Sequence, residues 1–207
     1  MSFALRFGAR DVRILGEENA FQGHFRIARL TLAHRCFNGG WSEPLTREVF
    51  HRGDAVGVLP YEPESDSLVL VEQFRPGALR ADDSPWMLEL VAGIVEAGED
   101  DRDVVHREAG EEAGCRLAEL KPIASYFPSA GACSEHVRLY CGRVLEAGVG
   151  EVHGVDGEGE DILVHRLSRA EALELLAADR VPNGHTLVAL QWLALHGERL
   201  RRDWLDA

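Results

Sequence analysis

The sequence predicts an α+β protein in which a mixed β-sheet is packed between helices. Short apolar runs separated by turn residues dominate the first half of the chain, which is typical of strands. Segments with helical spacing follow in the second half. Of the 207 residues, 45% are hydrophobic, which is enough apolar material for one or two cores.

The first strands are expected before residue 72. Residues 21–35 alternate imperfectly between apolar and polar side chains, as a partly buried antiparallel strand does, and the FNGG stretch at 37–40 indicates a hairpin. Residues 46–50, 55–59 and 68–71 are the next predicted strands, with a turn over 60–66. We place a domain boundary near residue 45, because the acidic segments all lie beyond it. This predicts a small antiparallel β-sheet domain over 1–45 and a larger domain over 46–207.

The second half of the chain predicts both strands and helices. Strands are expected at 86–92, 123–127, 137–144 and 162–167. Residues 93–98 indicate a loop, and residues 100–113 a helix that Gly114 ends. Ser168 and Glu171 have the spacing of a capping box ahead of an apolar run, so a helix is expected to begin there. A last helix is expected over 185–201, where leucines recur at near-helical spacing.

Negative charge is concentrated in two short segments. The formal net charge is −13, and residues 96–112 hold eight acidic residues against two arginines, a net −6. Residues 151–161 add five acidic residues and no basic one, a net −5. Such segments repel nucleic acid and attract divalent cations. We therefore expect no nucleic-acid partner.

The sequence also predicts a cytoplasmic protein without a membrane partner. No run approaches the ~20 apolar residues of a membrane-spanning helix, and arginines occupy the place of a signal peptide's apolar centre. The four cysteines form no C-x-x-C pair, so they indicate neither a zinc ribbon nor a disulfide framework.

Three glutamates share one edge of the predicted helix over 100–113. Glu108, Glu111 and Glu112 lie within about 100° of arc. The neighbouring apolar stripe consists of Val105, Ala109 and Ala113. Carboxylates at this spacing repel one another unless a cation neutralises them, and hard oxygen ligands suit Mg²⁺ or Mn²⁺. Taken alone, the cluster is more typical of a solvated helix face than of a metal site.

The spacing around this cluster resembles a known signature. Gly93, Glu99, the Arg107–Glu108 pair, the Glu111–Glu112 pair and Gly114 match G-x5-E-x7-R-E-U-x-E-E-x-G-U, the box of the Nudix hydrolases, at every fixed position. The resemblance implies a loop–helix–loop that hydrolyses nucleoside diphosphates linked to another group. It implies Glu108, Glu112 and the carbonyl of Ala92 as metal ligands and two or three Mg²⁺ ions, with Mn²⁺ as a substitute. It also implies that Arg107 positions the glutamates and that Glu111 and Glu99 support them.

Beyond the box, the segments WMLELVAGIVEAGE, YFPSAGACSE, HGVDGEGEDILVH and ALQWLALHGE resemble the bacterial ADP-ribose pyrophosphatase branch of that family. The resemblance implies a homodimer with swapped N-terminal sheets that cleaves ADP-ribose to AMP and ribose 5-phosphate. It implies a mobile loop in which Glu158 is the base and Glu160 a metal ligand. The glycines of that loop permit such motion. A solvated acidic turn is the alternative.

The same resemblance implies a set of substrate-binding residues. Arginine forks suit phosphate oxygens, although Arg47 and Arg75 could also be ordinary surface residues. His24 stands where the branch has an adenine-stacking aromatic residue, and Ala130 where it commonly has proline. Another sugar nucleotide as substrate, or an ADP-ribose sensor without activity, are the open alternatives. The implied substrate-binding residues are His24, Arg47, Arg75, Ile94, Ser129 and Glu135.

Overall fold

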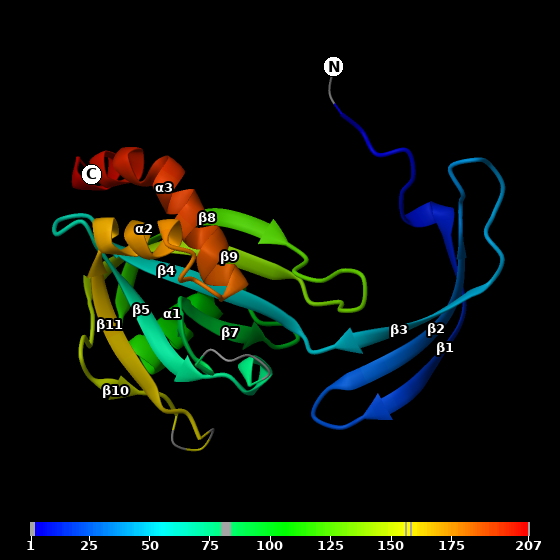
Figure 1. Cartoon of the computed structure of the whole chain (residues 1–207), viewed down its shortest axis with the longest axis horizontal. Coiled ribbons are helices and arrows are strands. Elements are labelled where there is room, and N and C mark those ends of the chain that lie inside the picture. The colour runs from blue at the N-terminus through cyan, green and yellow to red at the C-terminus, as the bar shows by residue number, and fades with distance from the viewer. Residues whose placement is uncertain (1–2, 80–83, 156, 158, 207) are drawn as a thin grey trace. The chain divides into compact units, whose positions relative to one another are not determined.

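The computed structural model describes residues 3–79, 84–155, 157 and 159–206 (Figure 1). The chain divides into two compact units. The first comprises Met1–Gly53 and Phe127–Glu135, and the second comprises Asp54–Tyr126 and His136–Ala207. The first unit extends beyond the boundary predicted near residue 45, because the strand over Leu45–His51 pairs with the strand before it.

The first unit is built on an antiparallel sheet with the order β1-β2-β3, formed by Val12–Gln22, Arg26–His34 and Leu45–His51. The short 3-10 helix η1 (Ala9–Asp11) precedes it. Every residue of β1 is exposed, so one side of this sheet ends in an uncovered edge strand. The segment 127–135 joins this unit because Phe50 exchanges backbone hydrogen bonds with Ala132 (2.8 Å) and Ser134 (3.0 Å).

The second unit contains the main sheet, with the order β10-β11-β5-β4-β9-β8. Strand β7 pairs with β4, and β6 pairs with β5. The β4–β9 pair is parallel and the other pairs are antiparallel. The strands are β4 (Asp54–Glu62), β5 (Ser67–Phe74), β6 (Trp86–Glu89), β7 (Val91–Val95), β8 (Arg116–Tyr126), β9 (Val137–Glu146), β10 (Val152–His153) and β11 (Ile162–Ser168).

Helices cover both faces of this sheet, which confirms the predicted sandwich (Figure 1). Helix α1 (Asp101–Ala113) packs on one face, where Val56 and Val58 of β4 meet Val105. Helices α2 (Arg169–Ala177) and α3 (Gly184–Leu205) lie on the other face, where Leu59 of β4 belongs to the same cluster as Leu193. Strand β4 is therefore buried on both sides, as its continuous apolar sequence requires. The short 3-10 helix η2 (Pro76–Ala78) follows β5.

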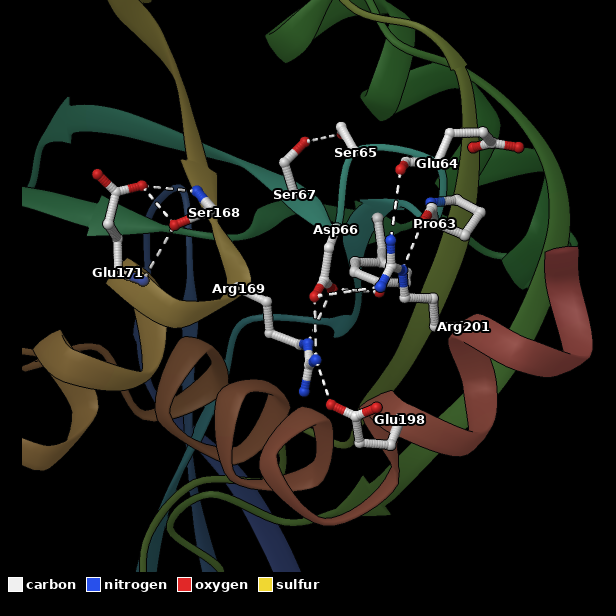
Figure 2. Close-up of polar contacts among 11 residues, drawn as sticks. Pro63, Glu64, Ser65, Asp66, Ser67, Ser168, Arg169, Glu171, Glu198 and Arg201 are labelled. Carbon is white, nitrogen blue, oxygen red and sulfur yellow. Dashed lines mark hydrogen bonds and ion pairs between the residues drawn. The ribbon is translucent and has the colours of Figure 1, made fainter.

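Helix α2 begins at the predicted capping box (Figure 2). Glu171 N–H donates to Ser168 Oγ (3.2 Å), and Ser168 N–H donates to Glu171 Oε2 (2.8 Å). The expected helices and the strands at 123–127, 137–144 and 162–167 are present with shifted ends. No helix in the described ranges has the length and apolarity to cross a membrane.

A polar network ties the β4–β5 turn to α2 and α3 (Figure 2). Arg169 Nε and Nη2 donate to the two carboxylate oxygens of Asp66 at 2.8 and 3.0 Å, and Arg169 also pairs with Glu198 of α3. Tyr61 Oη donates to the same carboxylate at 2.6 Å. Hydrogen bonds from Arg169 lower the pKa of Asp66, so this carboxylate is charged at neutral pH.

Candidate active site

Helix α1 presents its box residues because both of its ends are well defined. Asp100 caps the N-terminus by accepting a hydrogen bond from Arg102 N–H (2.9 Å). Gly114 ends the helix in the left-handed conformation, with φ of 54°. The predicted apolar stripe, Val105, Ala109 and Ala113, is buried against the sheet. The glutamates on the adjacent edge are thereby turned toward β7.

Glu112 is a buried carboxylate with few hydrogen-bond donors around it. Only 3% of the residue is exposed, and one carboxylate oxygen, Oε2, accepts a hydrogen bond from Ala92 N–H at 3.0 Å. Burial raises the pKa of Glu112 to about 8, and the negative charges of Glu108 and Glu160 add to the rise. The positive charge of Arg75 lowers it, so Arg75 lies close enough to Glu112 to affect its ionisation.

Glu108 lies against the backbone of β7. A methyl group added at Gly93 would stand 2.0 Å from Glu108 Oε1, so a residue larger than glycine would force this carboxylate out of its position. Burial is the largest influence on Glu108 and raises its pKa, while Arg107 opposes the rise. The first glycine of the box is therefore explained by packing. Because Gly93 has no side chain, it leaves a space that the Glu108 carboxylate fills, here called the Gly93 cradle.

Arg107 gathers the glutamates of the box around one guanidinium. Its Nη1 lies 2.8 Å from Glu108 Oε1 and 3.3 Å from Glu111 Oε2, and its Nη2 lies 3.8 Å from Glu99 Oε1. Glu99 also accepts a hydrogen bond from Glu96 N–H at 2.8 Å, which closes the loop before α1. The structure therefore brings Arg107, Glu108, Glu111 and Glu99 together, while the roles that the resemblance implies for them stay predictions.

The segment between β10 and β11 returns to the same helix. Gly154 N–H donates to the carbonyl of Glu111 at 3.1 Å, and Val155 N–H donates to Glu160 Oε2 at 3.1 Å. The charge of Glu160 acts on both Glu108 and Glu112. The structure thus brings Glu160 toward the box glutamates. The predicted base, Glu158, lies outside the described residues.

These residues fit a divalent cation. In the ranges that the structure describes, no three acidic, histidine or cysteine side chains are close enough to form a ready-made metal cage. The charge of Glu108 nevertheless raises the pKa of Glu112, and the charge of Glu160 raises the pKa of both. Their carboxylate oxygens suit Mg²⁺. A cation at this edge of α1 would supply the missing compensation.

The predicted substrate residues are divided between the units. In the second unit, Arg75 pairs with Glu89 at 2.8 Å, and Ile94 lies on β7 with 38% of its surface exposed. Glu89 was not among the candidates from the sequence. Its signal was a charged residue inside the apolar run WMLELVAG, because a carboxylate there must find a buried partner.

The other four candidates belong to the first unit. The His24 ring lies 4.4 Å from that of Phe25 in the β1–β2 turn, and Arg47 of β3 donates to the carbonyl of Thr46 at 2.7 Å. The carbonyl of Ser129 accepts the turn hydrogen bonds of the 127–135 segment, and Glu135 is 6% exposed beside an arginine, with 3.2 Å between Glu135 Oε1 and Arg52 Nη1.

Comparison with known proteins agrees with the box. The NUDIX domain family matches residues 51–196. The chain is 40% identical over 198 residues to the ADP-ribose pyrophosphatase of Escherichia coli, covering 96% of this chain and 95% of the relative. The ADP-ribose pyrophosphatase of Haemophilus influenzae is 39% identical over 207 residues, covering 99% and 95% of the two chains.

More distant similarities extend the comparison. The GDP-mannose pyrophosphatase of Yersinia enterocolitica is 27% identical over 161 residues, covering 77% of this chain and 83% of the relative. A crystal structure described as an ADP compounds hydrolase shares the fold, with a TM-score of 0.67 at 20% identity, covering 95% of this chain and 99% of that one. With the complete box and the family match together, the chain belongs to the Nudix family of hydrolases.

Proposed function

We propose that this enzyme hydrolyses the pyrophosphate bond of ADP-ribose, giving AMP and ribose 5-phosphate. The observation that carries the hydrolytic chemistry is the pairing of the buried Glu112 with the partly buried Glu108, two carboxylates whose pKa values are both raised. The substrate is inferred from the two ADP-ribose pyrophosphatases that match the chain along nearly its whole length.

Nudix ADP-ribose pyrophosphatases generally depend on a divalent metal, and we propose Mg²⁺ here, with Mn²⁺ as a substitute and two or three ions per site. Glu108, Glu112, Glu160 and the carbonyl of Ala92 would hold it. When bound, Mg²⁺ neutralises charge on the pyrophosphate and orients the attacking water. The Gly93 cradle and the Ala92 N–H bond hold Glu108 and Glu112 in place for this role.

The remaining steps fall to side chains of this chain. Glu158 accepts a proton from the attacking water, whose oxygen forms a bond to one phosphorus while the bond from that phosphorus to the bridging oxygen breaks. The bridging oxygen leaves with the other phosphate. Arg107 keeps the box glutamates in position during the reaction, since its guanidinium contacts Glu108, Glu111 and Glu99.

The substrate contacts are proposed from chemistry. Arg47 and Arg75 offer guanidinium donors that suit the phosphates and the adjoining ribose. His24 offers a ring for stacking on adenine, and Ile94 an apolar surface. Ser129 and Glu135 are proposed to lie near the terminal ribose.

We also propose that two copies form a homodimer by exchanging their N-terminal sheets. Strand β1 supports this, because an edge strand that is exposed along its whole length is suited to pairing with a second chain. A sedimentation mass of ~46 kDa is expected at micromolar concentration, twice the 22.9 kDa of one chain. A single-chain mass would refute the dimer. A cytoplasmic setting accords with the four free thiols.

The test is product analysis with Mg²⁺ against ADP-ribose, ADP-glucose, GDP-mannose, NADH and diadenosine polyphosphates, with EDTA as the control. Hydrolysis should be fastest with ADP-ribose, giving AMP and ribose 5-phosphate, and should stop with EDTA. Preference for a sugar nucleotide would favour the second candidate, which the similarity to a GDP-mannose pyrophosphatase keeps open. Binding of ADP-ribose without cleavage of any compound would instead identify a sensor.

A further inference from the structure

Glu89 is a buried carboxylate at the end of β6. Only 3% of the residue is exposed, yet both oxygens have partners. Its Oε2 accepts hydrogen bonds from Arg75 Nε (2.9 Å) and pairs with Arg75 Nη2 (2.8 Å), and its Oε1 accepts one from Asn183 Nδ2 (2.9 Å). A carboxylate in this setting is retained only if such partners hold it, so its position is narrowly fixed.

Asn183 and Thr186 tie Glu89 to the start of helix α3. Asn183 is the N-cap, and its Oδ1 accepts hydrogen bonds from Thr186 N–H (3.0 Å) and from the Thr186 hydroxyl (3.1 Å). Thr186 Oγ1 in turn accepts one from Leu90 N–H at 2.9 Å. Leu90 lies between β6 and β7, where the chain passes from pairing with β5 to pairing with β4. The hydrogen bonds therefore form a closed ring that fixes Glu89 from both sides.

Arg75 is held by this ring on one edge only. Its Nε and Nη2 are both directed to Glu89, whereas Nη1 makes no hydrogen bond within the described part of the chain, and 42% of the side chain is exposed. Its positive charge also acts on Glu112. One edge of the guanidinium is thus anchored on Glu89, whereas Nη1 has no hydrogen-bond partner among the described residues.

We propose that Glu89 is a positioning residue that holds the Arg75 guanidinium in a fixed orientation, with its open edge toward the substrate's pyrophosphate. An arginine ordered in advance loses less conformational freedom when substrate binds. The inference rests on the proposed function, because it takes Arg75 as a substrate contact. The rival explanation is a purely structural ring that joins β6 to α3.

The experiment measures KM and kcat for ADP-ribose at saturating Mg²⁺ in Arg75→Ala, Glu89→Gln and the double variant. The amide of Glu89→Gln offers one acceptor oxygen, which cannot serve both Arg75 and Asn183. Glu89→Gln should raise KM about 10-fold and leave kcat within about twofold. The lost contact stabilises the bound substrate and the transition state equally. The double variant should be no worse than Arg75→Ala, because both changes remove the same interaction.

Glu146→Gln is the matched control. Arg116 holds Glu146 with the same two donor atoms on an exposed part of β8 and β9, so this variant should leave KM unchanged. Additive KM effects of Glu89→Gln and Arg75→Ala would overturn the proposal, as would a Glu89→Gln defect confined to Tm and kcat. An unchanged KM in Arg75→Ala would show that the assignment of Arg75 itself fails.

Arg75→Lys keeps the inference testable if Glu89→Gln does not fold. A lysine ammonium that pairs with Glu89 has no second edge to offer the pyrophosphate, so its KM should approach that of Arg75→Ala. A wild-type KM in Arg75→Lys would overturn the proposal.

Discussion

Two groups of carboxylates in the second unit have pKa values shifted in opposite directions. Asp66 receives hydrogen bonds from Arg169 and Tyr61, and its pKa is lowered (Figure 2). Glu112 is more deeply buried, receives a hydrogen bond from Ala92 N–H, and has a pKa raised to about 8. The first group joins the β4–β5 turn to α2 and α3. The second group is short of hydrogen-bond donors beside the Nudix helix, so burial favours the protonated form of Glu112.

Structural and functional carboxylates within one domain can therefore be distinguished by the donors that surround them. A carboxylate that stabilises the fold is surrounded by donors, because an unpaired buried charge is costly. A carboxylate that awaits a cation is left short of donors. Arg107 supplies the only guanidinium paired with Glu108 among the described residues, and it must share that charge with Glu111 and Glu99.

Removing one charge from each group tests this distinction most directly. Glu112→Gln should lower kcat/KM at saturating Mg²⁺ by at least ~100-fold, since the loss of even an outer-shell partner of a metal costs about 10- to 100-fold. Asp66→Asn should keep kcat/KM within about twofold while lowering stability by ~2 kcal/mol, because Arg169 keeps Glu198 but loses the charged partner that accepts two of its hydrogen bonds. Hydrolysis assays and denaturant unfolding of both variants are the measurements. Similar losses of activity in the two variants would refute the distinction.

A backbone change can test the same site without altering any charge. Gly93→Ala places a methyl group 2.0 Å from Glu108 Oε1, so the carboxylate must move. We expect a 10- to 100-fold drop in kcat/KM, with a higher Mg²⁺ concentration needed for half activity. Gly110→Ala is the matched control on α1, because nothing lies within 4 Å of the added carbon. It should retain activity and stabilise the protein by ~0.5–1 kcal/mol. Equal activities of the two alanine variants would argue against the cradle.

The Nudix helix could be predicted from sequence because its signals are local. Asp100 at the N-cap, Gly114 at the left-handed C-terminal position and the apolar stripe each act within a few residues. The spacing of Arg107 from its glutamates fixes which side chains meet, since they lie on one helix or on the loop directly before it. The capping box at Ser168 is confirmed for the same reason.

Other features depend on contacts that sequence periodicity does not record. Strand β1 was not predicted, because all of its residues are exposed and no burial pattern marks it. The turn at 23–25 separates it from β2, so the segment expected as one strand over 21–35 belongs to two. The 127–135 segment joins the first unit through backbone bonds to Phe50, about 80 residues away in sequence. The ring around Glu89 likewise depends on Asn183, 94 residues further on.

The third prediction concerns how the stability of the metal-free protein depends on pH. The pKa of Glu112 is about 8 in the folded protein, against 4.5 as its ordinary value. Between these values the folded protein keeps a proton that the unfolded chain has released, so the free energy of unfolding should fall as pH rises. The slope from one such group reaches at most ~1.4 kcal/mol per pH unit.

Denaturant unfolding of wild type and Glu112→Gln with EDTA, from pH 5 to pH 8, isolates this contribution as the difference between two curves. Asp66 cannot produce it, since a lowered pKa adds stability above the ordinary value and loses it only in acid. The wild type should lose stability relative to Glu112→Gln as pH rises. Saturating Mg²⁺ should reverse that trend, because the cation binds the deprotonated carboxylate. Parallel curves in EDTA would mean that Glu112 is already compensated in the folded protein, and the contrast with Asp66 would then fail.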